Sequence, residues 1–203
     1  MKKILLTLSI ASSLLMMQSC SSSSSDNMKA LEELEKKMAE EKANAVEKVT
    51  YKDLFEIEFP ESMSESTTLN DVAVVQQMDG AKELYTIVVQ ESIAEMHTAI
   101  KDNGLEEKYP LNINGYFGIL ETDLATKLLN QRSIKKSNKT INGMPAVILN
   151  VNGDIGGVPI HYTIAYVQGK ENYYQVMTWT LEGEKEKENQ PAMDKIIASF
   201  KEL

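Results

Sequence analysis

The sequence predicts an α+β domain in which a largely antiparallel sheet is covered by helices. Several short segments alternate between apolar and polar residues, which is the pattern of half-buried strands. The turn dipeptides Asp79-Gly80 and Asn142-Gly143 separate some of these segments and indicate hairpins. Two segments with helical spacing lie between the strands, and a third closes the chain. Because short hairpin connections join antiparallel neighbours, we expect an antiparallel sheet with helices over its buried face.

The first strands are expected between residues 55 and 90. Phe55–Pro60 alternates strictly and stops at a proline. A second strand is expected over Asp71–Met78 and a third over Leu84–Gln90, on either side of the Asp79-Gly80 turn. These segments predict the first hairpin of the sheet.

Two helices are expected next. Ser92 to Glu95 has the spacing of a capping box, and Gly104 is a suitable C-terminal glycine for the helix that follows. A second helix is expected over Tyr116–Asn130. Its buried stripe is expected to comprise Tyr116, Phe117, Leu120, Leu124 and Leu128.

The last third of the chain predicts a meander of strands. Strands are expected over Ser133–Ile141, Ala146–Val151, Val158–Gln168 and Tyr173–Leu181, with a glycine-rich turn over Asn152–Gly157.

A terminal helix is expected after the meander. The polar run Glu182–Asn189 is interpreted as a solvated loop, and Pro191 is expected to start the helix. Met193, Ile196, Ile197 and Phe200 follow at helical spacing.

The order of these elements resembles the PsbP/Mog1-like fold from about Tyr51 to the C-terminus. Four segments carry the resemblance: Phe55–Pro60, Ile141–Ala146, the hairpin from Val158 to Thr180, and Ile196–Lys201. They resemble the family's opening F-x-I-x-x-P strand, its x-x-G-x-x-A entry, its long hairpin and its closing I-x-x-S-F-K helix. The family contains accessory subunits, regulators of small GTPases and lipoproteins, so the resemblance implies a fold and transfers no functional residue.

The N-terminus predicts an export signal over residues 1–19. Lys2 and Lys3 give a positive start, and Ile4–Met17 follows without a charge. This apolar stretch is too short to span a bilayer, which needs roughly 20 residues. It ends in Met17-Gln18-Ser19-Cys20, which resembles the lipobox of bacterial lipoproteins.

Cys20 is the predicted site of lipid attachment. In lipoproteins a diacylglycerol is added to the cysteine sulfur, the signal is cut before the cysteine, and the new amine is acylated. Cys20 is the only cysteine of the chain, so no internal disulfide can form. The alternative is an incidental free thiol after an ordinary signal. The predicted partner of the mature N-terminus is therefore the membrane, reached through the acyl chains of Cys20.

Between the anchor and the domain we expect a tether and a stalk. Residues 20–27 contain the serine run Ser21–Ser25, which is typical of a flexible linker. Ser21 after the cysteine favours the outer membrane, on either its periplasmic or its surface side. Residues 28–49 are rich in helix formers and predict a helix that is a spacer, lies on the domain, or self-associates weakly. The domain itself is expected over residues 50–203.

Charge argues against nucleic-acid binding. The chain has a formal net charge of −9, which repels phosphate backbones. The nearest basic run, Arg132–Lys136 with Lys139, alternates like an exposed strand.

The sequence contains no recognisable catalytic, metal or cofactor site. The two histidines, His97 and His161, lack metal-site spacing. His97 is expected on the polar side of its helix, and His161 on the sheet face opposite the Val158–Tyr166 row. The aromatic residues Tyr173, Tyr174 and Trp179 are interpreted as core, with sugar stacking as the alternative.

From these observations we expect a non-catalytic, lipid-anchored protein of the cell envelope. It is expected to bind an envelope protein or another envelope component through its sheet or a sheet edge. The first alternative is a small-ligand carrier with a pocket between sheet and helices, and the second is an enzyme. A solid core with an exposed apolar patch would favour partner binding, whereas buried polar groups in a deep pocket would favour the alternatives.

Overall fold

The computed structural model describes residues 28–29, 31–37 and 45–203, and the chain divides into two compact units, Met1–Lys42 and Ala43–Leu203. In the first unit, residues 28–29 and 31–37 are helical. The predicted signal, Cys20 and the serine tether lie outside the described residues. The helix expected over 28–49 is wrong at its C-terminal end, because Val46–Tyr51 forms a strand.

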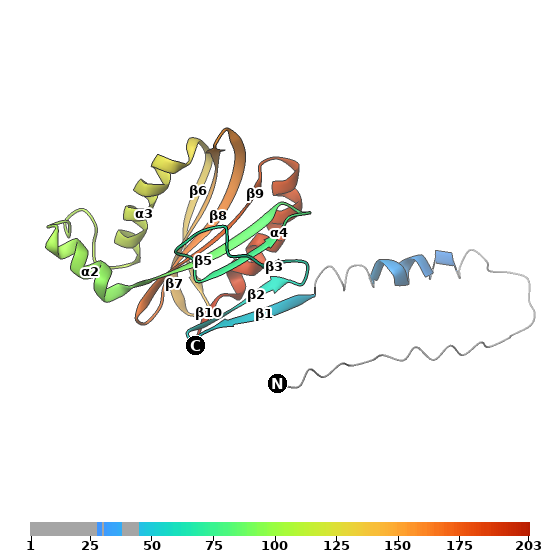
Figure 1. The fold of residues 1–203 in the computed structure, drawn as a ribbon, viewed down its shortest axis with the longest axis horizontal. Coiled ribbons are helices and arrows are strands. Elements are labelled where there is room, and N and C mark those ends of the chain that lie inside the picture. The colour runs from blue at the N-terminus through green and yellow to red at the C-terminus, as the bar shows by residue number, and fades with distance from the viewer. Residues whose placement is uncertain (1–27, 30, 38–44) are drawn as a thin grey trace, which may run out of the picture. The chain divides into compact units, whose positions relative to one another are not determined.

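The second unit contains a seven-stranded and a three-stranded sheet, and every strand pair in them is antiparallel (Figure 1). The large sheet has the order β3-β4-β5-β9-β8-β7-β6. Its strands are β3 Ser64–Glu65, β4 Val75–Asp79, β5 Leu84–Ser92, β6 Leu129–Ile141, β7 Met144–Ile155, β8 Val158–Gln168 and β9 Asn172–Leu181. The small sheet has the order β1-β2-β10, from β1 Val46–Tyr51, β2 Phe55–Pro60 and β10 Lys201–Glu202. The three helices of this unit are α2 Ile93–Asp102, α3 Ile113–Lys127 and α4 Glu184–Ser199. The predicted α+β class is confirmed.

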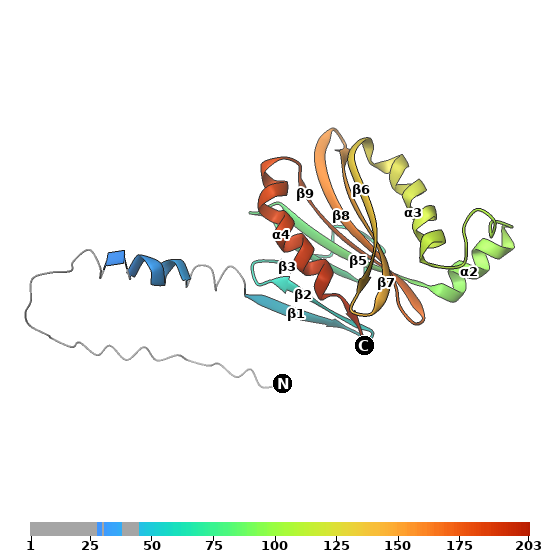
Figure 2. The same cartoon turned by 180° about the vertical axis from the view of Figure 1, so that it is seen from behind.

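Both faces of the large sheet are covered, whereas the sequence predicted one buried face. Helix α4 and strand β2 pack over one face, and α3 packs over the other (Figures 1 and 2). The prediction was wrong because alternating positions of β8 meet different layers: Ile164 and Tyr166 face α3, while Ala165 and Val167 face α4. The central strands β7, β8 and β9 therefore contribute side chains to two separate cores.

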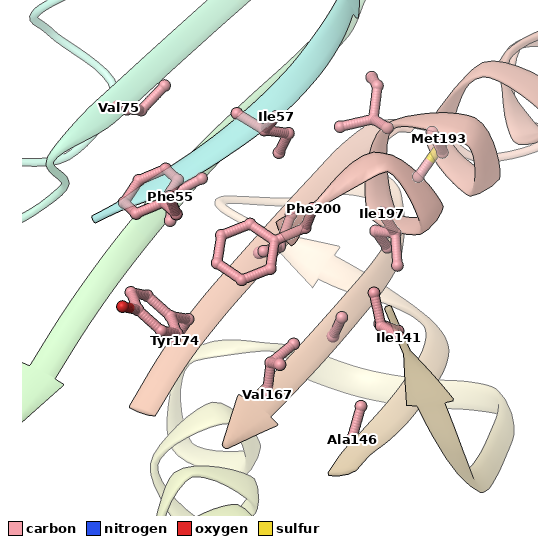
Figure 3. Close-up of a cluster of buried hydrophobic side chains, with 14 of the residues drawn as sticks. Phe55, Ile57, Val75, Ile141, Ala146, Val167, Tyr174, Met193, Ile197 and Phe200 are labelled. Carbon is pink, nitrogen blue, oxygen red and sulfur yellow. The ribbon is translucent and has the colours of Figure 1, made fainter. Parts of the chain in front are cut away.

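The first core lies beneath α4 and joins the two ends of the domain (Figure 3). The ring centroid of Phe55 lies 5.5 Å from that of Tyr174 and 5.1 Å from that of Phe200. All three rings are fully buried. Strand β2 and the C-terminal end of α4 thus pack against each other.

The second core lies beneath α3. Tyr116 stacks on Tyr173 with centroids 4.3 Å apart, and Phe117 meets Tyr166 edge-on at 5.2 Å. Tyr173 and Tyr174 therefore fill opposite faces of the sheet, and both are at most 1% exposed. Trp179 is half-buried and stacks on Tyr85 at 5.4 Å. The interpretation of these aromatics as core side chains agrees with the structure.

The glycine-rich segment is largely strand rather than turn. β7 continues to Ile155, and only Gly156 and Gly157, with φ of +58° and +85°, form the turn. Gly153 lies within the strand, where a Cβ would lie 2.4 Å from Cγ of Leu128. Its small size therefore gives Leu128 space to pack against the sheet.

Helix α4 begins seven residues earlier than Pro191, at Glu184, so the interpretation of Glu182–Asn189 as a loop was wrong. Glu184 and Glu186 lie in the first turn, where the positive end of the helix dipole favours acidic side chains. Pro191 lies inside the helix instead of starting it.

Other boundaries shifted by a few residues. β4 begins at Val75 rather than Asp71, and α3 begins at Ile113, after an N-cap by Asn112. α3 ends at Lys127, because Leu128 adopts an extended backbone conformation with φ −94° and ψ 102°. Ser92 caps α2 as predicted, accepting a hydrogen bond from the backbone N–H of Glu95.

Candidate functional site

The site predicted from the sequence, Cys20, lies outside the described residues, so its lipidation stays a prediction. Among the helices that the structure describes, none has both the length and the apolar character needed to cross a bilayer. The described residues also contain no cluster of three or more His, Cys, Asp or Glu side chains suited to a metal ion. Three features of the domain are candidate sites: a groove, a polar cluster and an exposed edge strand.

The first candidate is a groove of about 620 Å³ between α4 and the small sheet. We call it the α4 groove. Its apolar lining includes Val46, Pro60, Leu84, Pro191, Ala192 and Ile196. A volume of this size and an apolar lining are typical of small-ligand pockets.

Hydrogen bonds fix the two walls of the α4 groove. The hydroxyl of Ser199 accepts a hydrogen bond from the backbone N–H of Glu58 at 2.9 Å, which ties α4 to β2. At the other end, the side-chain amide of Asn189 donates to the carbonyl of Lys82 and to the hydroxyl of Thr180, each at 2.8 Å. The groove is therefore preformed.

An acidic side chain supports the rim of the α4 groove. Burial disfavours the charged form of Asp79 and raises its pKa. Hydrogen bonds from Ser62 and from the backbone N–H groups of Lys82 and Ala81, together with the positive charge of Lys82, outweigh burial, so the pKa of Asp79 is lowered. The ammonium of Lys82 lies 3.6 Å from this carboxylate. Lys82 is thus held at the mouth by a charged partner.

The second candidate is a polar cluster beneath the first turns of α4. The side-chain amide of Asn152 donates to Glu182 at 2.9 Å and to Glu186 at 3.1 Å. Its carbonyl oxygen therefore faces Nδ1 of His161 at 2.7 Å, and this nitrogen must carry a proton. His161 is 4% exposed and lies on the α4 face of the sheet.

Two ion pairs of Arg132 close the polar cluster at the sheet edge. Arg132 binds the carboxylates of Glu182 and of Asp154, the latter at 3.1 Å. The hydrogen bond from Arg132 lowers the pKa of Glu182, and bonds from Asn130 and Arg132 lower that of Asp154. Glu182 was expected in a solvated loop, and instead it links β6 to the start of α4. The polar cluster therefore positions the start of α4. His161 lines neither the α4 groove nor a second, smaller pocket of the domain, which has a volume of about 450 Å³ and lies beside β1.

His97 was expected on the polar side of its helix, and this prediction was wrong. Its Nε2 lies 3.0 Å from the hydroxyl of Tyr173, and its ring is half-buried. The neighbouring hydroxyl of Tyr116 donates to Glu91 at 2.5 Å, and the amide of Gln175 donates to the same carboxylate at 3.1 Å. Burial and the charge of Glu91 raise the pKa of Tyr116 far above its usual range. These contacts fasten α2 and α3 to the sheet.

The third candidate is the edge strand β6, which is the last strand of the large sheet. It spans 13 residues, most of them exposed, and carries the basic run noted in the sequence. Lys136 lies 3.7 Å from the ring centroid of Phe117 and 3.6 Å from the carboxylate of Glu121. Among the described residues, Lys135 and Lys139 have no ion-pair partner.

The fold defines the class of the domain as α+β and PsbP/Mog1-like. The solution structure of cyanobacterial PsbP (CyanoP) from Synechocystis sp. PCC 6803 matches with a TM-score of 0.52 at 12% identity, covering 78% of this chain and 93% of that one. This likeness shows the fold alone, and it confirms the fold that the sequence resemblance implied.

Two further structures are similar below a TM-score of 0.5. One is LpqN, involved in cell envelope biogenesis of Mycobacterium tuberculosis, with a TM-score of 0.47 at 11% identity over 78% of this chain and 91% of that one. The other is the Saccharomyces cerevisiae Ran-binding protein Mog1p, with a TM-score of 0.44 at 8% identity over 77% of this chain and 95% of that one. No protein-family model matches the chain, and no curated protein sequence matches it.

Sequence reasoning missed the α4 groove and the polar cluster. Both depend on residues 184–189 being helical, which the polar composition of that run did not indicate. A signal was present in the spacing of Gly183 and Glu186, which is that of a helix N-cap and its N3 residue. Glu186 reaches back to its N-cap, because its carboxylate accepts from the backbone N–H of Gly183 at 3.4 Å.

Proposed function

We propose that this chain is a lipid-anchored protein of the cell envelope that binds a protein partner without catalysing a reaction. Support for the anchor comes from the sequence: a positive start, an uncharged apolar stretch and a cysteine where the cut is expected. An acylated Cys20 would hold the domain at the membrane without any spanning helix.

The observation that carries the binding role is the exposed edge strand β6. Edge strands present unpaired backbone groups, and most proteins cover or shorten them. The opposite edge of the large sheet is formed by β3, which has only two residues, whereas β6 has 13. A long exposed edge strand, on a domain whose two cores are filled by its own side chains, supports a docking surface for another protein.

Metabolic labelling with an alkyne analogue of palmitate tests the anchor. The wild-type chain should be labelled and recovered with membranes. The Cys20→Ser variant should carry no label, while the matched tether variant Ser22→Ala should be labelled like wild type. Equal labelling of Cys20→Ser and wild type would refute the proposed anchor.

A second candidate function, a small-ligand carrier, is favoured by the α4 groove. Its volume of about 620 Å³ and apolar lining suit an uncharged apolar ligand. The probe is 1-N-phenylnaphthylamine, whose fluorescence rises in apolar sites. Ala192→Trp, which fills the groove, should abolish the rise, and Lys187→Trp, at an exposed position outside the lining, should leave it unchanged. Equal fluorescence in all three proteins would exclude the carrier function.

A further inference from the structure

We propose that the regular half of β6, Lys135–Ile141, binds an acidic, extended segment of a partner protein as an additional antiparallel or parallel strand. This inference rests on the proposed binding role and names the chemistry of the partner. It is argued from the backbone of β6, from the irregular half of the strand, and from its charges.

The hairpin geometry determines which backbone groups of β6 point outward. Ile141 pairs with Met144 across the two-residue turn Asn142-Gly143, whose φ angles are +46° and +87°. In such a hairpin the pair beside the turn exchanges hydrogen bonds, and bonded and non-bonded pairs then alternate. The backbone N–H and C=O groups of alternate residues therefore point away from β7. These residues are Lys136, Asn138 and Thr140.

The other half of β6 cannot accept a strand. Its pairing with β7 shifts register between Leu129 and Arg132 and again between Arg132 and Lys135. Asn130 and Ser133 there have φ of +48° and +54°. Such irregularities break the regular spacing of the edge and protect it from pairing. From Lys135 to Ile141 the register is continuous, so the available edge is confined to this half.

The charges on the regular half select an acidic partner. Lys135 pairs across the ladder with Asn150, and Lys139 with Ala146, so both lie on the α4 face of the edge. Neither has an ion-pair partner among the described residues, although the chain carries a net charge of −9. Acidic side chains at alternate positions of an added strand would lie beside these ammonium groups.

The same charges disfavour a second copy of this chain as the partner. If two β6 edges paired antiparallel about Ser137, Lys135 of each copy would oppose Lys139 of the other. Like charges directly opposite each other destabilise a strand pair. Lysine on the edge therefore disfavours self-pairing in this register, while it leaves the edge open to a strand of opposite charge.

The test uses the full-length lipoprotein in non-ionic detergent and an end-blocked peptide of alternating Glu and Val as the probe. Binding is followed by fluorescence anisotropy of a labelled peptide, and the site by hydrogen exchange of the β6 amides. A peptide of alternating Lys and Val is the control for charge. Vesicles containing phosphatidylglycerol are the control for anionic headgroups.

Two variants separate charge from backbone pairing. Lys135→Glu with Lys139→Glu should weaken peptide binding at least about tenfold, because two attractions become repulsions. Asn138→Pro removes one outward N–H without touching the β7 ladder and should weaken binding by a similar factor, while Asn138→Ser should bind like wild type. Unchanged thermal unfolding of each variant shows that the domain still folds.

The proposal holds if the Glu peptide binds, slows exchange at Lys136, Asn138 and Thr140, and loses affinity in both variants. Binding that survives Asn138→Pro, or equal binding of the Lys peptide, would overturn it. The proposal would also be overturned if the vesicles displaced the peptide by binding Lys135 and Lys139 without slowing exchange of the β6 amides. That result would assign the edge to anionic lipid. Because Cys20 labelling is measured separately, failure at β6 and failure of the anchor are distinguishable.

Discussion

Gly153→Ala should destabilise the domain because Gly153 provides space for Leu128. A Cβ at this position would lie 2.4 Å from Cγ of Leu128, 2.7 Å from its Cδ1 and 2.9 Å from the carbonyl oxygen of Leu129. Non-bonded carbon atoms normally approach to roughly 3.5 Å, so the overlap with Leu128 is about 1 Å. Leu128 is 1% exposed and cannot swing into solvent. Overpacking of this kind costs about 1–3 kcal/mol of unfolding free energy.

A double-mutant cycle tests the contact itself. Leu128→Ala alone should cost about 2–5 kcal/mol, because it removes a buried side chain and leaves a cavity. In the double variant the clashing Cγ and Cδ1 are gone and the new methyl occupies part of the cavity. The loss of unfolding free energy in the double variant should therefore be smaller than the sum of the two single losses by at least about 1 kcal/mol.

Urea unfolding followed by fluorescence gives these free energies, because Trp179 is the only tryptophan of the chain. Gly157→Ala is the matched control. Gly157 has a φ of +85° and no atom within 4 Å of the point where a Cβ would lie. The destabilisation by Gly157→Ala is therefore conformational, and its free energy should add to that of Leu128→Ala. Additive behaviour of Gly153→Ala and Leu128→Ala would refute the steric explanation.

Three further predictions concern buried polar groups. Thr86→Val should stabilise the domain by about 1 kcal/mol in urea unfolding, because the Thr86 hydroxyl is buried and has no hydrogen-bond partner among the described residues; a loss of stability would contradict this. His161→Phe should cost about 1–3 kcal/mol, since the buried oxygen of Asn152 loses its donor, and an unchanged urea midpoint would show that the bond is dispensable. Asp79→Asn should destabilise the domain more at pH 7 than at pH 2. The pKa of Asp79 is lowered on folding, so its stabilisation is present above about pH 4 and is lost as the pH falls through the folded-state pKa. If the difference in unfolding free energy between wild type and Asp79→Asn did not change with pH, ionisation of Asp79 would not be the source of the stabilisation.

The fold could be predicted where local pattern and tertiary environment agree. β8 matches its predicted range, Val158–Gln168, because its alternation continues without interruption. Ser92 caps α2 because the capping signal is local. The closing helix was recognised from Ile196, Ile197 and Phe200, whose spacing directs all three into the core.

The fold could not be predicted where distant residues decide the structure. Val46–Tyr51 follows a run of helix formers, and it becomes a strand by pairing with β2 along its full length. Small alternate residues such as Ala165 gave no sign that the second sheet face is covered by α4. Tertiary packing overrode local preference at these positions.

The candidate sites depend even more on tertiary structure. His97 looked solvent-facing by helical position, yet the Tyr173 hydroxyl reaches it from a strand 76 positions away. Arg132 looked like part of a plain basic strand, and its partner Glu182 lies 50 positions along the chain. Only the exposure of β6 and the place of Cys20 in its motif could be inferred from neighbouring residues.

The mass of the mature N-terminal tryptic peptide tests the central claim most directly. If the domain is tethered by lipid, the peptide should begin at Cys20, end at Lys29 and carry the added mass of a diacylglycerol and an acyl group. A peptide that begins elsewhere, or one whose Cys20 is a free thiol, would contradict the account.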